Sequence, residues 1–438
     1  MKKQISMVIL AVLTAMLLAG CAPTINEMYR VPKRSKEYSS LHSTIDMAMI
    51  GLEYSAPVSG SNRQSVQTAD LDGDGVDEYL VFAKGSHERP MQMLVFAETE
   101  KDRIQIVDVI ESNGFAFDQV VYAEIDDKPG YEILVGRQLS DQVLRNLSLY
   151  SFSDGSVEQL MSVPYSKFQT CDLDQNGMRD LVVVQPGTSE TDIAVAMLYS
   201  FRDGIMVRSV EAGLSQPVSN IKRIQEGMIY SGIPAVSISS TEDESAVVTD
   251  ILALKEGWFV NILASDPGAA TIQALRNYYV YPEDIDRDGI LELPSLLTTY
   301  SYASDWNNEQ QYLLQWFSVD LDGNRVEKLY SFHNFVGGWY VQLEGDLARH
   351  MSIEQMGSTY IFSLWNEEDS SFTVLFSIYA LTGSDRKTQS EEDNRFTLYS
   401  TDTVVYAAKI ETEVEAYGIN EEMLVNSFRL ISQHRSAE

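Results

Sequence analysis

The chain has 438 residues, of which 44% are hydrophobic and 10% aromatic, a composition typical of an ordered globular protein. It carries 64 acidic and 32 basic residues, which give a net charge of −32. No Lys/Arg cluster stands out in the folded region, and this argues against binding of nucleic acid or direct adhesion to anionic lipid, since both need basic patches. We interpret most of the acidic excess as a solvated surface that aids solubility.

The N-terminus reads as an export signal. Met1-Lys2-Lys3 is basic, and residues 5–18 are apolar but too few for a membrane span, which needs about 20 residues. The segment ends in Leu18-Ala19-Gly20-Cys21, which resembles the lipobox of bacterial lipoproteins. The resemblance implies cleavage before Cys21 and a diacylglyceryl group on its sulfur. We therefore expect a signal peptide over 1–20, a lipidated Cys21 with a polar tether over 21–45, and an extracytoplasmic protein anchored to the membrane.

Cysteine usage fits this expectation. Only Cys21 and Cys171 are present, and lipidation of the first leaves no pair for a disulfide within the chain. Cys171 stands in a predicted strand, where it is most simply a small buried hydrophobe.

Residues 70–78, 172–180 and 284–292 repeat one pattern. Each segment has acidic or amide side chains at positions 1, 3 and 5, Gly at position 6 and a carboxylate at position 9. Side chains two apart on a tight loop converge, and Gly permits the turn. Converging carboxylates repel one another unless a cation lies between them, and Ca²⁺ prefers such oxygen ligands. We therefore predict about three structural calcium sites, in which the residue at position 7 contributes its backbone carbonyl. The predicted ligands of the first site are Asp70, Asp72, Asp74, Val76 and Glu78. Those of the second are Asp172, Asp174, Asn176, Met178 and Asp180, and those of the third are Asp284, Asp286, Asp288, Ile290 and Glu292.

An EF-hand is the competing interpretation of this spacing. It requires a bidentate Glu at position 12 and flanking helices, but position 12 is Val81, Val183 or Ser295. The residues after each loop are typical of β-strands, as in the run Leu181 to Val184. The loops are therefore predicted to join two strands.

A calcium loop between strands resembles the FG-GAP and VCBS-type repeats of bacterial surface proteins and of the integrin α-subunit propeller. The Phe-Gly and Gly-Ala-Pro signatures are absent, so the resemblance implies the fold and the metal site but no particular ligand. Extracellular modules bind Ca²⁺ at about 10⁻⁴ to 10⁻³ M, and we expect this range here. The loop at Asp172 has three carboxylates and an amide where the others have four carboxylates, so charge count predicts that it is the weakest.

Two further acidic turns are predicted to hold no metal. The segment 124–132 has Lys128 where a ligand is needed, and we expect its ammonium to pair with Asp126 or Glu132. The turn at Asp320 would have Lys328 at position 9, and strand-forming residues continue on both sides of the turn, which indicates a hairpin. Asp-Gly pairs at 154–155 and 203–204 likewise predict two-residue hairpin turns.

A longer unit of four antiparallel strands recurs about every 50 to 60 residues, which is typical of a β-propeller blade. We predict an all-β fold in which residues 46–411 form about six blades, or seven if residues 44–56 and the C-terminus complete another. The sixth unit is expected to begin at Trp339. Residues 412–438 are predicted to be a helical tail, with a helix from Asn420 to Ser432 capped by Asn420 and an apolar stripe of Leu424, Phe428 and Ile431.

Signals of catalysis are sparse. The five histidines form no metal-binding pair, and no nucleophile elbow, zinc-protease helix or phosphate loop occurs. No catalytic residue is predicted, and a non-enzymatic module that binds or scaffolds an envelope protein or glycan is the favoured interpretation. One alternative is a polysaccharide-active enzyme, which would need two carboxylates roughly 5 to 10 Å apart. The other is an accessory protein of a signalling or assembly system.

Overall fold

The computed structural model describes residues 36–99, 103–139, 145–185, 192–241, 246–264, 280–300, 311–368, 370–412 and 414–431. The predicted signal peptide, Cys21 and the first part of the tether lie outside these residues. In the part of the chain that is described, no helix combines the length and apolar character needed to cross a bilayer.

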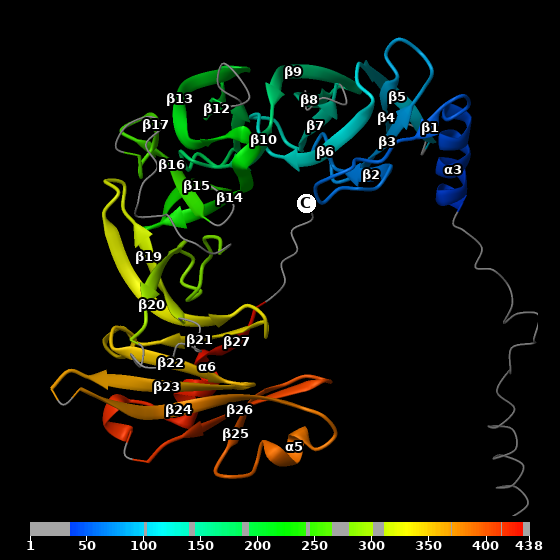
Figure 1. Ribbon diagram of the computed structural model, residues 1–438. Helices are drawn as coiled ribbons and strands as arrows, with labels where there is room; N and C mark the ends of the chain where they lie inside the picture. Colours follow the sequence, from blue (N-terminus) through cyan, green and yellow to red (C-terminus); the bar gives the residue numbers. More distant parts are fainter. Residues whose placement is uncertain are drawn as a thin grey trace, which may run out of the picture.

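The protein is all-β, as predicted, and its strands form six antiparallel sheets (Figure 1). The first sheet contains β1 (Glu53–Tyr54), β2 (Val66–Ala69), β3 (Glu78–Lys84), β4 (Met91–Thr99) and β5 (Arg103–Ser112). The second contains β6 (Ala116–Ala123), β7 (Glu132–Gln138), β8 (Arg145–Ser153) and β9 (Ser156–Tyr165), and the third β10 (Lys167–Cys171), β11 (Asp180–Gln185), β12 (Ile193–Arg202) and β13 (Ile205–Pro217).

The remaining three sheets follow in chain order. The fourth contains β14 (Ile221–Ile229), β15 (Ile233–Thr241), β16 (Val247–Lys255) and β17 (Trp258–Asn261). The fifth contains β18 (Leu293–Thr298), β19 (Tyr312–Val319), β20 (Arg325–Asn334), β21 (Trp339–Leu343) and β27 (Phe428–Leu430). The sixth contains β22 (Met351–Met356), β23 (Thr359–Asn366), β24 (Ser371–Thr382), β25 (Phe396–Ser400) and β26 (Val404–Ile410).

Tight turns join most neighbouring strands. Asp154 and Gly155 have φ values of 54° and 73°, and Asp203 and Gly204 have 51° and 85°. Ser153 pairs with Ser156 and Arg202 with Ile205 on either side of these turns. Both predicted Asp-Gly hairpins are thereby confirmed, since positive φ at both central residues matches the twist of the flanking strands.

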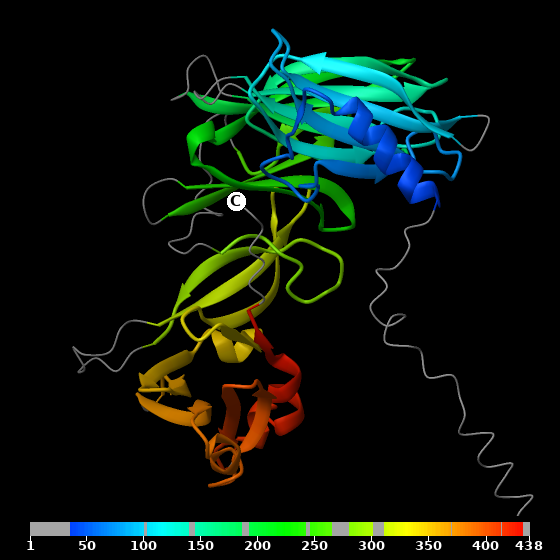
Figure 2. The same cartoon turned by 90° about the vertical axis from the view of Figure 1, so that its right-hand side faces the viewer.

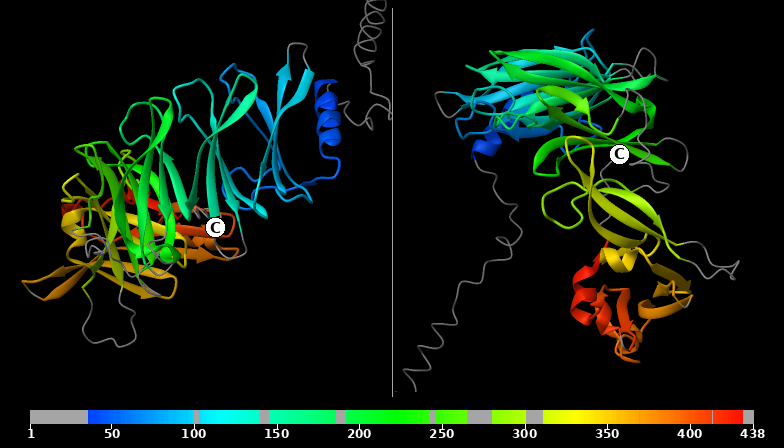
Figure 3. Two further views of the ribbon diagram at one scale, coloured as in Figure 1. Left: turned by 90° about the horizontal axis from the view of Figure 1, so that it is seen from above. Right: turned by 90° about the vertical axis from the view of Figure 1, so that its left-hand side faces the viewer.

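The sheets pack face to face in the order of the chain. Separate apolar clusters join the first sheet to the second, the second to the third, the third to the fourth, the fourth to the fifth and the fifth to the sixth. Central strands such as β11 are buried on both faces, which explains why Leu181 to Val184 is a continuous apolar run. The sheets follow an arc, and the first and sixth lie at its two ends (Figures 1 to 3). Among the described residues, no apolar cluster joins these two end sheets.

The predicted tether is wrong in its last ten residues. Helix α3 (Lys36–Ala48) begins inside it and packs on the first sheet through Leu41, Ile45 and Met49. These residues recur at helical spacing, so one face of the helix meets Val81 and Leu94 of the sheet. After the helix, β1 pairs with β3 in the first sheet, and residues 44–56 do not begin a seventh unit.

The predicted start of the sixth unit is also wrong. Trp339 lies in β21, which pairs with β20 and belongs to the fifth sheet. A short helix, α4 (Gly345–Ala348), then leads to β22 in the sixth sheet. Trp339 is fully buried against Phe332 and Tyr360, so it packs between these two sheets.

The C-terminal helix is shorter than predicted. Helix α6 (Glu421–Ser427) is capped by Asn420, whose side chain accepts a hydrogen bond of 2.9 Å from the Met423 amide, as expected from the sequence. The helix ends at Ser427 rather than Ser432, because residues 428–430 extend as β27 and pair with β21. Phe428 packs on Trp339 with ring centroids 5.4 Å apart. The other short helices are η1 (Val218–Asn220), α5 (Arg386–Gln389) and η3 (Glu415–Tyr417).

Candidate metal loops and inter-sheet cavities

The same pattern of hydrogen bonds occurs within each of the three predicted metal loops. Loop 70–78 joins β2 to β3, loop 172–180 joins β10 to β11, and loop 284–292 leads into β18. In each loop the amide of the Gly at position 6 donates to the position 1 carboxylate over 3.0 Å. The amide at position 7 donates to the side-chain oxygen at position 5 over 2.7 to 2.8 Å. The repeated sequence pattern therefore corresponds to a repeated loop structure.

The backbone turns at two positions in each loop. Position 6 is Gly in all three, with φ between 85° and 89°. Position 4 is also in the left-handed region, although it is Gly73 in one loop and Gln175 or Arg287 in the others. The sequence pattern indicated the first of these turns but not the second, since long side chains rarely occur at positive φ.

The loops bring most of the predicted carboxylates together. Oxygen atoms from Asp284, Asp286, Asp288 and Glu292 all lie within 4.8 Å of one another. Oxygen atoms of Asp70, Asp72 and Glu78 form a second such group, and those of Asp172, Asp174 and Asp180 a third. Asp74 is not in its group, and its Oδ1 accepts the Val76 amide instead. This oxygen-rich donor set suits a hard divalent cation.

The carboxylate at position 9 is the buried member of each group. Glu78, Asp180 and Glu292 are 4%, 3% and 0% exposed, and each accepts a hydrogen bond from the amide at position 2. Burial, reinforced by the neighbouring carboxylates, raises the pKa of Glu78 to about 7 and that of Glu292 to about 8. Burial also raises the pKa of Asp180. A bound cation would stabilise the charged form of these groups, since its charge offsets both the cost of burial and the repulsion between carboxylates.

Two buried oxygen atoms in these groups lack a hydrogen-bond partner among the described residues. They are Asp70 Oδ1 and Glu292 Oε1. A buried acceptor without a partner costs roughly 1 to 3 kcal/mol, more when it is charged. The residues present therefore fit a metal ion, which would supply the missing partner.

The segment 124–132 keeps the hydrogen bond from the position 2 amide to the position 9 carboxylate but satisfies its acids differently. Lys128 Nζ lies 3.8 Å from Asp126 Oδ2, so the predicted pairing with one of the two acids is made with Asp126. Ser151 donates to Asp126 Oδ2 at 2.9 Å and to Glu132 Oε1 at 3.4 Å. The buried acids of this segment thus have protein partners.

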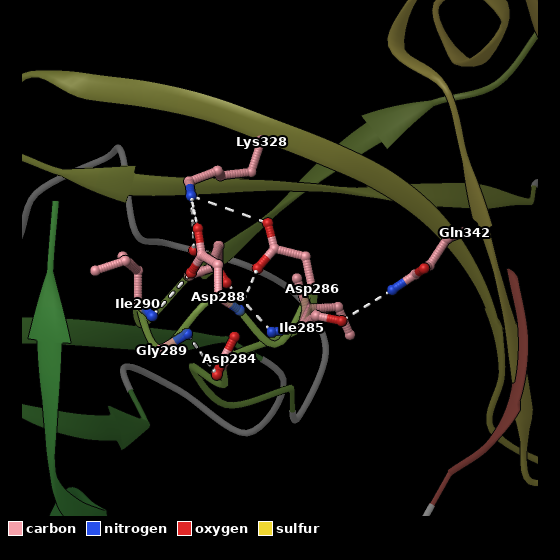
Figure 4. A network of polar contacts seen from close by, with 9 residues as sticks. Asp284, Ile285, Asp286, Asp288, Gly289, Ile290, Lys328 and Gln342 are labelled. Atoms are coloured by element: carbon pink, nitrogen blue, oxygen red, sulfur yellow. Dashed lines mark hydrogen bonds and ion pairs between the residues drawn. The ribbon is translucent and has the colours of Figure 1, made fainter. Parts of the chain in front are cut away.

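The turn at Asp320 is a hairpin connection between β19 and β20, as predicted. The Asp320 carboxylate accepts hydrogen bonds from the amides of Asp322 and Asn324 and from the Asn324 side chain. Lys328, on β20, reaches loop 284–292 instead (Figure 4). The sequence pattern did not indicate this contact, because 40 residues separate Lys328 from Asp288.

Loops of neighbouring sheets are joined by backbone hydrogen bonds. The Tyr131 amide donates to the Asp70 carbonyl at 3.1 Å, and the Arg179 amide to the Glu124 carbonyl at 2.7 Å. The Leu291 amide makes the corresponding contact with the Met228 carbonyl of β14 at 2.6 Å. The loops therefore connect one sheet to the preceding one at the same edge.

A cavity of about 470 Å³ lies between the fifth and sixth sheets. Its walls carry aromatic rings, amides and aliphatic side chains, and the described lining includes no Asp, Glu, Lys or Arg; the residues are Leu296, Gln311, Tyr312, Leu314, Phe332, His333, Asn334, Phe335, Val336, Gln355 and Tyr360. Phe335 and Val336 are exposed at its rim. The cavity is thus uncharged and largely aromatic.

His333 is the one titratable imidazole in this lining. Its ring stacks on Tyr340 with centroids 4.7 Å apart. Its Nε2 atom is buried and, among the described residues, has no hydrogen-bond partner. Burial lowers the pKa of His333 to about 3, so the ring is neutral at physiological pH.

A second cavity, of about 770 Å³, lies between the fourth and fifth sheets. It shares His333 and Phe335 with the first cavity and is bordered by Asp284 of the metal loop. Glu226 also lines it, but this carboxylate is ion-paired with Arg179. The second cavity is therefore the more polar of the two.

No protein-family model and no curated protein matches the chain. Similar solved structures include the exotype rhamnogalacturonan lyase YesX, at 12% identity over 76% of this chain and 67% of that one, with a TM-score of 0.27. Rhamnogalacturonan lyase YesW has 10% identity over 74% and 67%, and the Bacillus licheniformis rhamnogalacturonan lyase PL11 has 11% over 74% and 72%, both with TM-scores of 0.27.

Proposed function

We propose that the chain is a calcium-stabilised, extracytoplasmic lipoprotein that binds an uncharged glycan of the cell envelope. Cys21 carries the lipid anchor, and the six sheets are the blades of a β-propeller of FG-GAP or VCBS type. Calcium occupies the loops at Asp70, Asp172 and Asp284 and stabilises the fold by linkage, since its ligands converge only in the native chain.

The propeller arrangement is supported by the strand order and by the loops. Each sheet is built mainly from strands that are consecutive in the chain, and each packs on the next one. Backbone hydrogen bonds between corresponding loop positions repeat this relation at one edge of the sheets. Both are properties of radially repeated blades.

The uncharged aromatic cavity between the fifth and sixth sheets is the observation that carries the glycan assignment. The rings of Tyr312 and Phe335 offer flat apolar surfaces for the C–H faces of a sugar, whereas Phe332 and Tyr360 are buried. Amides of Gln311, Asn334 and Gln355 stand beside these rings. A few polar groups in a mostly apolar pocket fix the orientation of a ligand.

His333 contributes an imidazole ring to the lining. Because the ring is neutral and the lining carries no formal charge, an uncharged sugar suits the cavity better than an acidic one.

Titration of the unlipidated chain, residues 22–438, with neutral oligosaccharides tests the proposal. Phe335→Ala, which removes an exposed ring at the rim, should weaken binding about tenfold, the factor that corresponds to about 1.4 kcal/mol. Trp258→Ala is the matched control, because Trp258 is an exposed aromatic residue on β17 outside the cavity. Equal losses in both variants, or no binding of any neutral glycan by the folded protein, would count against the glycan assignment.

A polysaccharide-active enzyme is the second candidate, and the polar cavity between the fourth and fifth sheets favours it. Glu226, Glu283 and Asp284 line that cavity. We rank it second because Glu226 is paired with Arg179 and Asp284 accepts the Gly289 amide within the metal loop. Formation of new sugar ends from a polysaccharide by the wild-type chain, and its loss in Glu283→Gln, would favour this candidate over the first.

A further inference from the structure

Lys328 lies inside the acidic group of loop 284–292. Its Nζ is in direct contact with Asp288 Oδ2 and lies 3.9 Å from both Asp286 Oδ2 and Glu292 Oε1 (Figure 4). Lys328 belongs to β20, and its side chain is 18% exposed. One ammonium group therefore faces three of the four carboxylates that would hold a metal ion.

Glu292 is the residue that most needs this ammonium. It is fully buried, and its Oε1 has no hydrogen-bond partner among the described residues. In the second sheet the corresponding oxygen of Glu132 is bonded to Ser151. Strand register places Ser318 in the same position relative to Glu292, but Ser318 Oγ is buried without a hydrogen bond. Among the described residues, Lys328 is thus the cationic group that faces Glu292.

The other two metal loops differ in this respect. Among the described residues, no ion pair joins a basic side chain to the carboxylates of Asp70, Asp72 or Glu78. Loop 172–180 has one weak contact, in which Arg202 Nη2 lies 4.0 Å from Asp174 Oδ2 and the arginine is 62% exposed. Of the three loops, loop 284–292 is the one that holds a partly buried basic side chain within the described part of the chain.

An ammonium and a calcium ion cannot both occupy this group. Ca²⁺ takes 6 to 8 oxygen ligands at 2.3 to 2.6 Å, so it needs the oxygen atoms that Lys328 contacts. Two cations sharing one site would also repel each other. The long lysine side chain can move out to solvent, but its three contacts with the carboxylates have to break before calcium binds.

We propose that Lys328 is the resident cation of loop 284–292, which neutralises the loop in the absence of calcium and has to withdraw before calcium binds. This inference rests on the proposed calcium sites. Carboxylate count ranks the loops at Asp70 and Asp284 equally, whereas this inference makes the Asp284 loop the weaker of the two.

Calorimetric titration of calcium into the unlipidated chain, residues 22–438, tests the proposal. Lys328→Met keeps the length of the side chain and removes its charge. It should tighten one site on the order of tenfold or more, because one competing positive charge is lost. Lys255→Met is the control, because Lys255 pairs with Asp322 in a turn outside the three loops and its removal should change no site.

Thermal melts give a second readout that does not depend on calorimetry. In excess chelator, Lys328→Met should melt below wild type, since Asp286 and Asp288 lose their counter-charge. In millimolar calcium the same variant should regain stability by a larger increment than wild type. If its chelated form does not fold, the double variant Lys328→Met/Glu292→Gln removes the buried charge and should restore folding.

The outcomes separate this inference from the proposed function. If wild type binds calcium at loop 70–78 but Lys328→Met changes neither affinity nor the calcium increment in the melt, Lys328 is not the resident cation and the calcium assignment survives. If neither protein binds calcium, both the calcium assignment and the inference are overturned. A tightened site in Lys328→Met that is lost on adding Asp284→Ala supports the inference.

Discussion

Gly130 shows how closely neighbouring loops approach at the scale of single residues. Its φ is 104°, and a Cβ atom there would lie 2.3 Å from the Leu71 carbonyl oxygen. At Gly73, across the same contact, a Cβ would lie 2.4 Å from Pro129 Cβ. Backbone meets backbone here, so a side chain fits at neither position.

Gly130→Ala should lower the free energy of unfolding by about 2 to 4 kcal/mol, because backbone strain and a steric overlap act together. Gly155→Ala is the matched control. Its φ is 73° but no atom lies within 4 Å of an added Cβ, so it should cost only about 1 kcal/mol. Urea denaturation of both variants measures the difference, and equal losses would show that the contact between the loops is unimportant.

The residues that act within one loop were predictable, whereas those that act across the fold were not. Asp70, Asp72 and Glu78 meet because they lie within nine consecutive residues of one turn. Lys328 reaches Asp288 from 40 residues away, and His333 enters the cavity walls through the packing of sheets. Contacts of the second kind depend on strand register, which a single sequence specifies only weakly.

At the scale of elements, each metal loop leads into a strand, and the loops at Asp70 and Asp172 also follow one. The sequence excluded an EF-hand because strand-forming residues follow the loops, and β3, β11 and β18 lie where those residues are. It did not indicate helix α3, because the segment 36–48 is mostly polar and its apolar residues are meaningful only against the first sheet. It placed Trp339 in the sixth unit, whereas Trp339 begins β21 of the fifth sheet, directly after the turn that follows β20.

Asp70→Ala should remove one calcium ion from the protein and reduce the rise of the melting temperature in millimolar calcium. The physical reason is linkage, since an ion that binds only the native state stabilises it by about 2.7 kcal/mol at 100 times its Kd. Asp320→Ala should leave the number of ions unchanged, because its carboxylate is used by the hairpin turn. An unchanged melt of the wild type on adding calcium would contradict the assignment of the loops as calcium sites.

At the scale of the whole molecule, the six sheets and their order followed from the recurrence of strands, turns and loops. The recurrence did not predict how the N-terminal and C-terminal segments pack on the sheets. Helix α3 packs on the first sheet, and the C-terminal residues return to β21 of the fifth. Such contacts involve residues at opposite ends of the recurring pattern, where periodicity carries no information.

Cys21→Ser should release the exported protein from the membrane fraction into the soluble fraction. Two acyl chains give stable anchoring, and within the described ranges no helix is suited to cross a bilayer. Cys171→Ala is the control, since Cys171 is buried in the third sheet and its removal should leave the protein membrane-bound. Membrane association of Cys21→Ser that withstands high salt would refute the lipid anchor.

The pairing of β27 with β21 has a consequence for biosynthesis. The fifth sheet can be finished only after residues 428–430 have emerged, although its first four strands are made about 90 residues earlier. A chain that begins folding while it is still being made would hold an open edge at β21 until residues 428–430 arrive. Removing residues 428–438 should therefore lower the yield of folded protein, because it leaves β21 unpaired and takes Phe428 out of the core.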